Sequence, residues 1–132
     1  MSEENVRIAR RALQLFNAGD LPAFFELFDP ELTYRNREDE PDVRLYRGLE
    51  DYKGYVASWL EMFDDLRFET QDFIDLGDEV IVVTDLVGRG RHTGADVRGS
   101  YVFLLRLRDG VIVQGREYAA KEEALEAAGL SE

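Results

Sequence analysis

Apolar residues recur at helical spacing in three segments of the first half of the chain. Residues 3–17 place apolar side chains three or four positions apart, which predicts an amphipathic helix. Gly19 and Asp20 are suited to end that helix and to cap a short second one, with Pro22 in its first turn. Residues 49–63 repeat the helical pattern and are rich in aromatic side chains. The pattern therefore predicts three N-terminal helices.

Strand-like runs occupy most of the remaining chain. Residues 31–36 alternate polar and apolar side chains, as in a first strand, and a polar loop follows them. Four later runs are joined by short turns that contain glycine; they span 66–76, 79–90, 96–108 and 111–118. Strands with such short connections pair as an antiparallel meander, and residues 120–128 add a last short helix. We expect one α+β domain over residues 1–132, with the helices packed on one side of a bent antiparallel sheet.

The run at residues 80–87 is apolar on both of its alternating faces. A strand of this kind needs a cover on each side, because neither face suits water. The helices can cover one face of the sheet. We expect the other face to pack against a second copy of the chain, which predicts a homodimer formed through the back of the sheet.

Asp85 interrupts this apolar run. By strand parity it shares a face with Ile81 and Val83. If that face is the concave one, Asp85 is a carboxylate in a mostly apolar pocket, which is the setting of a general acid or base. The alternative is an aspartate that pairs with a cross-strand arginine, or one that lies at the solvent-exposed edge.

The excess of acidic residues restricts which partners the chain is expected to bind. With 16 basic and 28 acidic residues the formal net charge is −12, which disfavours nucleic acid and anionic membrane surfaces. No window approaches the ~20 apolar residues of a transmembrane helix, and we expect a cytoplasmic protein. The chain has no cysteine and a single histidine, His92, so we expect no structural zinc and no cofactor. We expect His92 in an exposed hairpin and the acidic run at 37–40 on the surface.

Three long segments carry a resemblance to a known family. They are "LFNAGDLPAFFELFDPELTY" (15–34), "RGLEDYKGYVASWLEMFDDLRFE" (47–69) and "LRDGVIVQGREYAAKEEALEAAGL" (107–130). The chain resembles the nuclear-transport-factor-2-like (cystatin-like) superfamily, in its SnoaL-like polyketide cyclase and ketosteroid isomerase branch. The resemblance implies a cone in which three helices pack over the concave face of the sheet. This fold hosts several reactions as well as proteins without catalysis, so it does not identify one.

The resemblance to ketosteroid isomerases does not extend to their reacting residues. Those enzymes use a tyrosine on the first helix and two acids on the first and fourth strands. Here the corresponding positions hold Ala12, Asn36 and an aromatic residue, either Tyr101 or Phe103.

The chain is locally more similar to limonene-epoxide hydrolase-like members, which position water with Tyr-x-Asn and an Asp–Arg–Asp set. Tyr34, Asn36, Asp85 and Glu117 stand at matching positions. The family's arginine and tryptophan are replaced by two smaller residues, which are Val83 and Gly115. The resemblance implies that Tyr34 and Asn36 orient a water or a carbonyl oxygen, and that Glu117 is a second acid or tunes the first.

Two further features concern the pocket. Gly115 leaves space beside Glu117 that could admit a ligand, although Glu117 could instead form an ion pair with Arg91 or Arg98. Aromatic side chains could select a flat or hydrophobic molecule, although this spacing is also typical of a core. They are Trp59, Tyr55, Phe63, Tyr101 and Phe103.

Two functions are compatible with these residues. The first is a cofactor-independent lyase, isomerase or hydrolase that acts on a hydrophobic small molecule, with Asp85 as its acid or base. The second is a non-catalytic ligand-binding or dimerisation module of the same fold.

Overall fold

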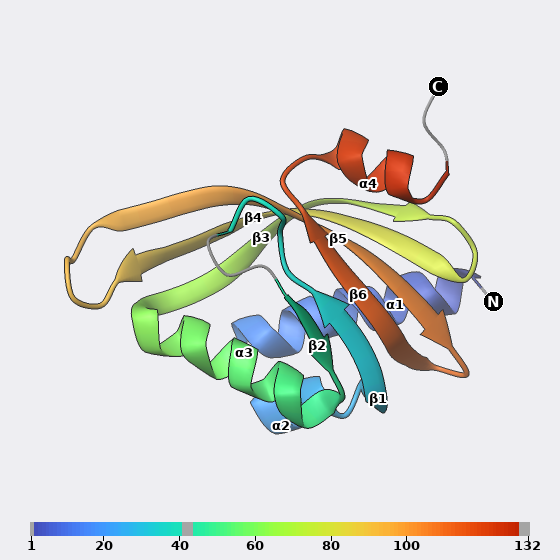
Figure 1. The fold of residues 1–132 in the computed structure, drawn as a ribbon, viewed down its shortest axis with the longest axis horizontal. Helices are drawn as coiled ribbons and strands as arrows, with labels where there is room; N and C mark the ends of the chain where they lie inside the picture. The colour runs from blue at the N-terminus through green and yellow to red at the C-terminus, as the bar shows by residue number, and fades with distance from the viewer. Residues whose placement is uncertain (1, 41–43, 130–132) are drawn as a thin grey trace.

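A six-stranded sheet with helices on both faces organises the chain (Figure 1). The structure is a computed structural model, and it describes residues 2–40 and 44–129. The elements in chain order are α1 (Ser2–Asn17), α2 (Leu21–Phe25), β1 (Phe28–Arg35), β2 (Leu45–Arg47), α3 (Leu49–Met62), β3 (Phe63–Asp75), β4 (Glu79–Gly90), β5 (Asp96–Arg108), β6 (Val111–Tyr118) and α4 (Lys121–Ala127). The α+β class, the three N-terminal helices and the four later strands are confirmed.

The strands lie in the order β2-β1-β6-β5-β4-β3. Strands β3 to β6 form the expected antiparallel meander. Strand β1 pairs with β6 in parallel, so the expectation of a wholly antiparallel sheet is wrong at this one pairing. The short β2 lies in the segment predicted as a polar loop and pairs with β1, because three residues are too few to show a strand period.

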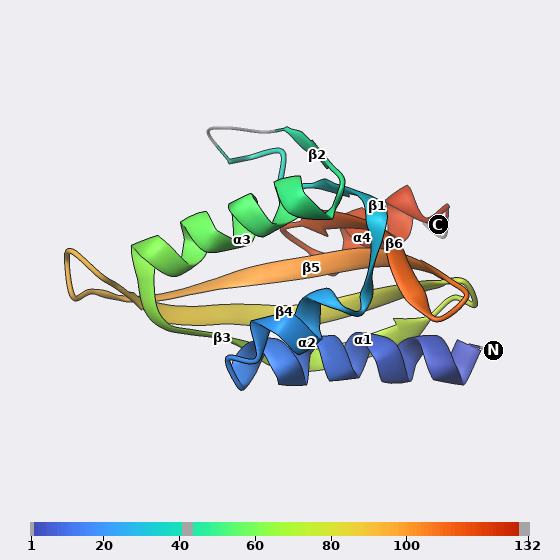
Figure 2. The same cartoon turned by 90° about the horizontal axis from the view of Figure 1, so that it is seen from below.

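Helices α1, α2 and α3 lie on one side of the sheet, and α4 lies away from them near the C-terminus (Figure 1). Figure 2 shows α1 running beside β3 and β4, with α3 next to β1 and β2. Asp20 caps α2 as expected, since its side chain accepts a hydrogen bond from the Ala23 backbone N–H. Within the described residues, no helix has the length and apolar character needed to cross a membrane.

Strand β4 contributes to a separate apolar cluster on each face. Val80, Val82 and Leu86 belong to the main core, between the sheet and the N-terminal helices. Ile81 belongs to a smaller cluster under α4, and Val83 packs against it. The chain therefore covers part of the second face itself, with α4. The homodimer through this face stays a prediction.

The pairing of β1 with β6 places Tyr34 opposite Gly115. A Cβ atom on Gly115 would lie 2.7 and 2.8 Å from two carbons of the Tyr34 ring, closer than packed carbon atoms approach. The ring thus occupies the space that the missing side chain leaves. The expectation that this space admits a ligand is wrong, because Tyr34 fills it.

We expect Gly115→Ala to destabilise the fold by about 1–3 kcal/mol, the usual cost of overpacking a core. Gly54→Ala is the matched control, because an added Cβ there meets nothing within 4 Å on the exposed face of α3. It should stabilise the fold by about 0.5–1 kcal/mol through helix propensity. Urea unfolding followed by circular dichroism compares the two. A Gly115→Ala protein as stable as the wild type would contradict the close packing of Tyr34.

Candidate functional site

A cavity of about 80 Å³ lies between the sheet and the N-terminal helices. Its walls are mostly apolar side chains from α1, α2, α3 and the strands. Glu117 is the carboxylate among the lining residues. A cavity of this size holds several waters or a small organic fragment, since one water needs about 10–15 Å³.

The Glu117 carboxylate is held by two tyrosine hydroxyls. Its side chain comes from β6 and the residue is 6% exposed. Tyr34, from β1, donates a short hydrogen bond to Glu117 Oε2. The Tyr55 hydroxyl, from α3, lies 2.9 Å from Oε1 and 3.0 Å from Oε2. Two other elements, β1 and α3, therefore converge on the buried carboxylate of β6, and their two hydroxyls replace the water lost on burial.

Burial dominates the electrostatics of this cluster. It raises the pKa of Glu117 to about 7 from an ordinary value of 4.5, and the nearby charge of Glu40 acts in the same direction. Hydrogen bonds from Tyr34 and Tyr55 favour the ionised carboxylate and limit the rise. Burial and the negative charge of Glu117 also raise the pKa of Tyr34 and of Tyr55. The tyrosines thus remain neutral donors while Glu117 can change its protonation near pH 7.

A second carboxylate lies beyond Tyr55. The Tyr55 hydroxyl is 3.4 Å from Glu40 Oε1, and the Tyr101 hydroxyl is 3.4 Å from Glu40 Oε2. Glu40 is half-buried, and burial raises its pKa. Beside it, the Arg37 guanidinium stacks 4.6 Å from the centre of the Tyr101 ring and donates to the Ser100 carbonyl at 2.8 Å.

The expectation that the acidic run 37–40 is only solvated surface is therefore wrong for Glu40. The run is rich in charge, and no spacing within it shows that its last residue turns towards the tyrosines. Tyr55 has one hydroxyl proton, so it donates fully to only one of Glu40 and Glu117 at a time. A proton passes between the two carboxyl groups if one of them gives its proton to the Tyr55 oxygen while the hydroxyl gives its own proton to the other.

Six of the predicted site residues line the cavity together. They are Tyr34, Tyr55, Trp59, Tyr101, Phe103 and Glu117. The alternative ion pairs of Glu117 are wrong, because Arg91 pairs with Asp64, and Arg98 pairs with Glu69 and Asp85.

Asp85 and Val83 lie on the opposite face of the sheet from the cavity. On β4 it is Val82 and Leu86 that line the cavity, so the odd-numbered neighbours point away from it. Asp85 Oδ2 lies 2.9 Å from Arg98 Nη1 on the neighbouring strand, and its side chain is 29% exposed. The expectation that Asp85 looks into the pocket is wrong. The cross-strand arginine pair, which was the alternative, is confirmed.

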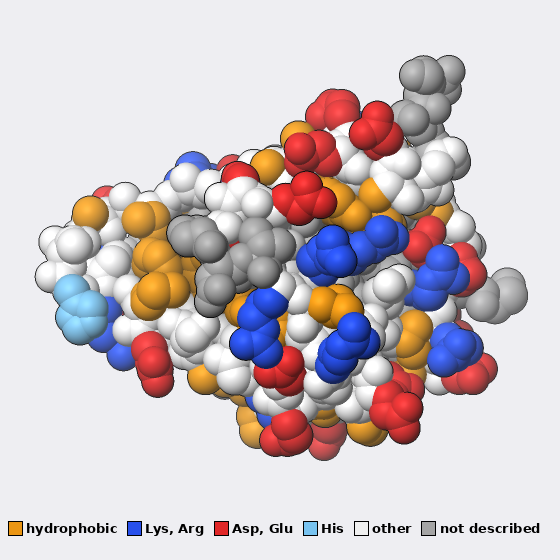
Figure 3. All heavy atoms as spheres, in the orientation of Figure 1, with side chains coloured by type: hydrophobic (Ala, Val, Ile, Leu, Met, Phe, Trp, Pro, Cys, Tyr) orange, Lys and Arg blue, Asp and Glu red, His pale blue; other side chains and the backbone are white. Residues whose placement is uncertain are grey.

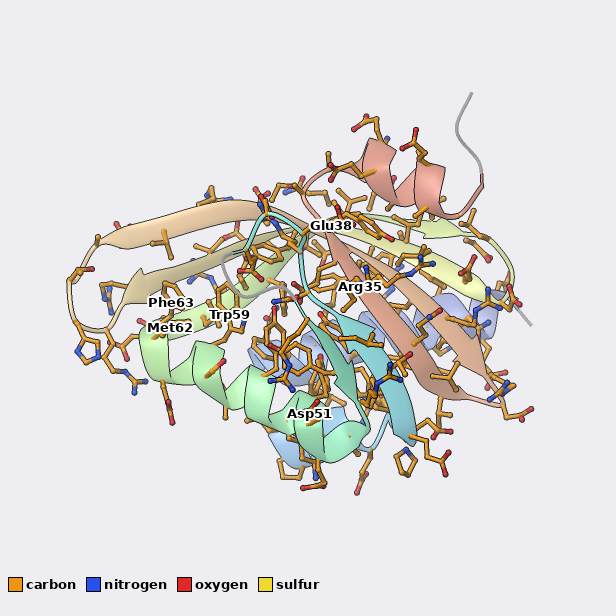
Figure 4. The ribbon with its side chains drawn as sticks, viewed as in Figure 1. Arg35, Glu38, Asp51, Trp59, Met62 and Phe63 are labelled. Atoms are coloured by element: carbon orange, nitrogen blue, oxygen red, sulfur yellow. The ribbon has the colours of Figure 1, made fainter. Side chains whose placement is uncertain are left out.

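Phe63 and Asn36 are not among the residues that line the cavity. Phe63 stacks on Trp59 with ring centres 5.5 Å apart at the end of α3, and Figure 4 labels both with Met62. Asn36 is buried just after β1, and its side-chain oxygen accepts the Arg44 backbone N–H at 2.9 Å. Asn36 thus ties the segment after β1 to the start of β2.

Tyr52 is a site residue that the sequence pattern identified only as part of the helix core. Its side chain lines the cavity, and its ring centre lies 4.5 Å from that of Tyr34. Its position three residues before Tyr55 on α3 is the signal that could have indicated a shared face. In the described part of the chain, no group of three His, Asp or Glu side chains is arranged to hold a metal ion.

His92 is exposed in the β4–β5 hairpin, as expected.

The raised pKa of Glu117 predicts how the free energy of unfolding depends on pH. Because the folded state holds this proton more tightly than the unfolded state, the contribution is favourable below pH 4.5 and is lost as the pH rises through about 7. The loss is on the order of 3 kcal/mol for a group buried to this degree. We expect Glu117→Gln to remove this part of the decline in unfolding free energy between pH 5 and pH 8, as measured by urea unfolding.

Glu122→Gln, which removes an exposed carboxylate on α4, is the control and should keep the wild-type slope. An unchanged slope in Glu117→Gln would show that Glu117 is ionised throughout this range.

Comparisons with known proteins show which family the chain is similar to. The family model described as "SnoaL-like domain" matches residues 9–115. A comparison with curated proteins gives no match. An NTF2-like protein of unknown function from Burkholderia pseudomallei superposes with a TM-score of 0.78 at 17% identity, covering 96% of this chain and 97% of that one.

Two further solved structures have the same fold. A protein from Jannaschia sp. CCS1, provisionally named a SnoaL-like polyketide cyclase, has a TM-score of 0.77 at 20% identity and covers 100% and 95% of the two chains. A protein with a ketosteroid isomerase-like fold from Catenulispora acidiphila, solved with trimethylamine, has a TM-score of 0.74 at 20% identity over 93% and 92%. The matched model spans most of the chain, and the chain therefore belongs to the SnoaL-like domain family, with the NTF2-like fold.

Proposed function

We propose that the chain is a cofactor-independent enzyme of the lyase, isomerase or hydrolase type, in which Glu117 exchanges a proton with a small hydrophobic substrate or with water. One observation carries this proposal. A carboxylate with a pKa of about 7 closes an otherwise apolar, aromatic-lined cavity, and two tyrosine hydroxyls fix its position.

The pKa of Glu117 suits proton transfer in either direction. Near neutral pH both its forms are populated, so it can take a proton from a ligand or give one. When Glu117 is protonated, the hydroxyls of Tyr34 and Tyr55 no longer serve an ionised partner and can donate to a ligand oxygen. Glu40 supports the same role, because the Tyr55 hydroxyl connects it to Glu117 and offers a route for the proton.

The volume of the cavity limits the size of the ligand. At about 80 Å³ it is smaller than a cavity of roughly 150 Å³ that accepts benzene. The ligand is therefore small, or α3 shifts away from the sheet when a larger one enters. Trp59, Tyr101 and Phe103 supply the walls that favour an apolar body.

A second candidate is non-catalytic binding of a small organic cation. Aromatic rings around a carboxylate are a common arrangement for methylated ammonium groups, which the rings attract through their negative faces. Here Tyr52, Tyr55, Trp59 and Tyr101 surround the cavity that contains Glu117. The trimethylamine complex of the Catenulispora protein supports this candidate as an example from the same fold.

A thermal-shift screen of lipophilic ketones, epoxides and aromatic fragments tests the enzyme proposal, since a ligand that binds the folded state raises its melting temperature. Each stabilising compound is then assayed for turnover. We expect Glu117→Gln to lower kcat by a factor of about 100 or more, the usual contribution of a positioned acid or base. Asp85→Asn is the matched control and should leave kcat unchanged. Turnover that survives Glu117→Gln would refute the proposal.

The cation candidate predicts a different pH dependence. Trimethylammonium should bind more tightly as the pH rises from 5 to 8, because Glu117 becomes ionised over that range. Calorimetric titration measures the affinity, and tert-butanol, of similar size without charge, is the control. Equal binding of both compounds at all pH values would exclude charge recognition by Glu117.

A further inference from the structure

A groove of about 370 Å³ crosses the sheet surface opposite the cavity. It runs over β2, β1 and β6. Tyr34 and Glu117 point into the cavity, so their neighbours Arg35 and Arg116 point to this outer face. Thr33, Gln114 and Tyr118 line the groove with them. Figure 3 shows basic side chains gathered over this part of the surface, and Figure 4 labels Arg35 within it.

Two arginines stand directly opposite each other in this groove. Arg35 and Arg116 are Cα partners in the parallel pairing of β1 with β6. Like charges in this relation repel and destabilise a sheet. Among the described residues, no acidic side chain lies within 4.0 Å of the Arg35 guanidinium, and Arg116 reaches only Glu79, at 4.0 Å. The acidic residues that the structure describes thus neutralise the pair poorly, in a chain whose net charge is −12.

Besides the repulsion from Arg35, Arg116 has a second feature that lowers the stability of the fold. Its Nε atom is buried and has no hydrogen-bond partner among the residues that the structure describes. A buried donor without a partner costs stability, and such groups are uncommon in folded proteins. The repulsion and the missing bond are both relieved if an anion lies beside the two guanidinium groups and draws Arg116 towards it.

We propose that this groove binds the oxyanion group of a small organic anion, a carboxylate or a phosphate monoester. Guanidinium groups on strands about 4.8 Å apart can donate together to one such group, and arginine suits this task by its planar array of donors. Thr33 and Gln114 add polar groups on the same face. Leu45 and Tyr118 also line the groove and can contact the organic body of the ligand. Glu117 borders both the groove and the cavity, but the two arginines lie on the outer face, so the site does not depend on the function proposed for Glu117.

Glu38 also lines the groove, with an exposed carboxylate. It opposes an incoming anion, so its removal provides a test with the opposite sign. Glu38→Gln removes this charge at nearly constant side-chain size, so we expect it to raise the affinity for an anion.

The experiment is a titration of the ¹⁵N-labelled protein with inorganic phosphate and with phenyl phosphate at constant ionic strength, followed by NMR. We expect the Nε–H signals of Arg35 and Arg116 to shift in a saturable way, with phenyl phosphate binding more tightly. Arg35→Gln should weaken phosphate binding about tenfold or more, as expected for loss of a charge-assisted hydrogen bond. Glu38→Gln should strengthen it.

Arg67→Gln is the matched control, because it removes the same charge from β3 at the other edge of the sheet. Equal weakening in Arg35→Gln and Arg67→Gln would show that phosphate responds only to net charge, and would overturn the proposal. So would signals of Arg35 and Arg116 that do not move, or phosphate binding unaffected by Glu38→Gln. If Arg35→Gln does not fold, the shifts in the wild type and the Glu38→Gln result decide.

Discussion

The structure depends on the compensation of one buried charge. An ionised carboxylate loses its water when a core closes over it, at a cost that only specific hydrogen bonds can offset. Glu117 meets this constraint with hydroxyls that come from β1 and from α3. The tyrosine side chains therefore do more than fill the core. Tyr34, Tyr52 and Tyr55 all belong to the core, and Tyr34 and Tyr55 also supply the donors that the carboxylate needs.

The same constraint explains the geometry of the strand pair beneath it. The Tyr34 ring packs closely against β6 at Gly115, and the missing side chain of that residue allows this approach. The parallel pairing of β1 with β6 fixes the register in which the two meet. Glu40, held through Tyr55 and Tyr101, extends the polar cluster from the interior towards the surface. Packing, register and the protonation of Glu117 are thus parts of one arrangement.

The bounds of the helices and of β4, β5 and β6 could be predicted from the sequence because they rest on local signals, such as glycine turns and helical spacing. The pairing of β1 with β6 could not, since it joins residues about eighty positions apart that carry no mutual signal. Tyr34 and Glu117 were identified through the resemblance to a family. The sequence does not show on which face Asp85 lies, because β4 is apolar on both sides and alternation does not show which side borders the cavity. The half-buried position of Glu40 was hidden in a run of charges.

Alternation does decide the faces of β1 and β6, where the two sides differ sharply in character. A slip of one residue in either strand would turn an arginine into the aromatic core and expose its tyrosine or glutamate partner. Burying Arg35 or Arg116 without a counterion would cost several kcal/mol, far more than the repulsion between them at the surface. The two arginines therefore help to specify the register that assembles the Glu117 cluster, even though they never touch it. The outer groove and the inner cavity are consequences of a single strand pairing, viewed from its two faces.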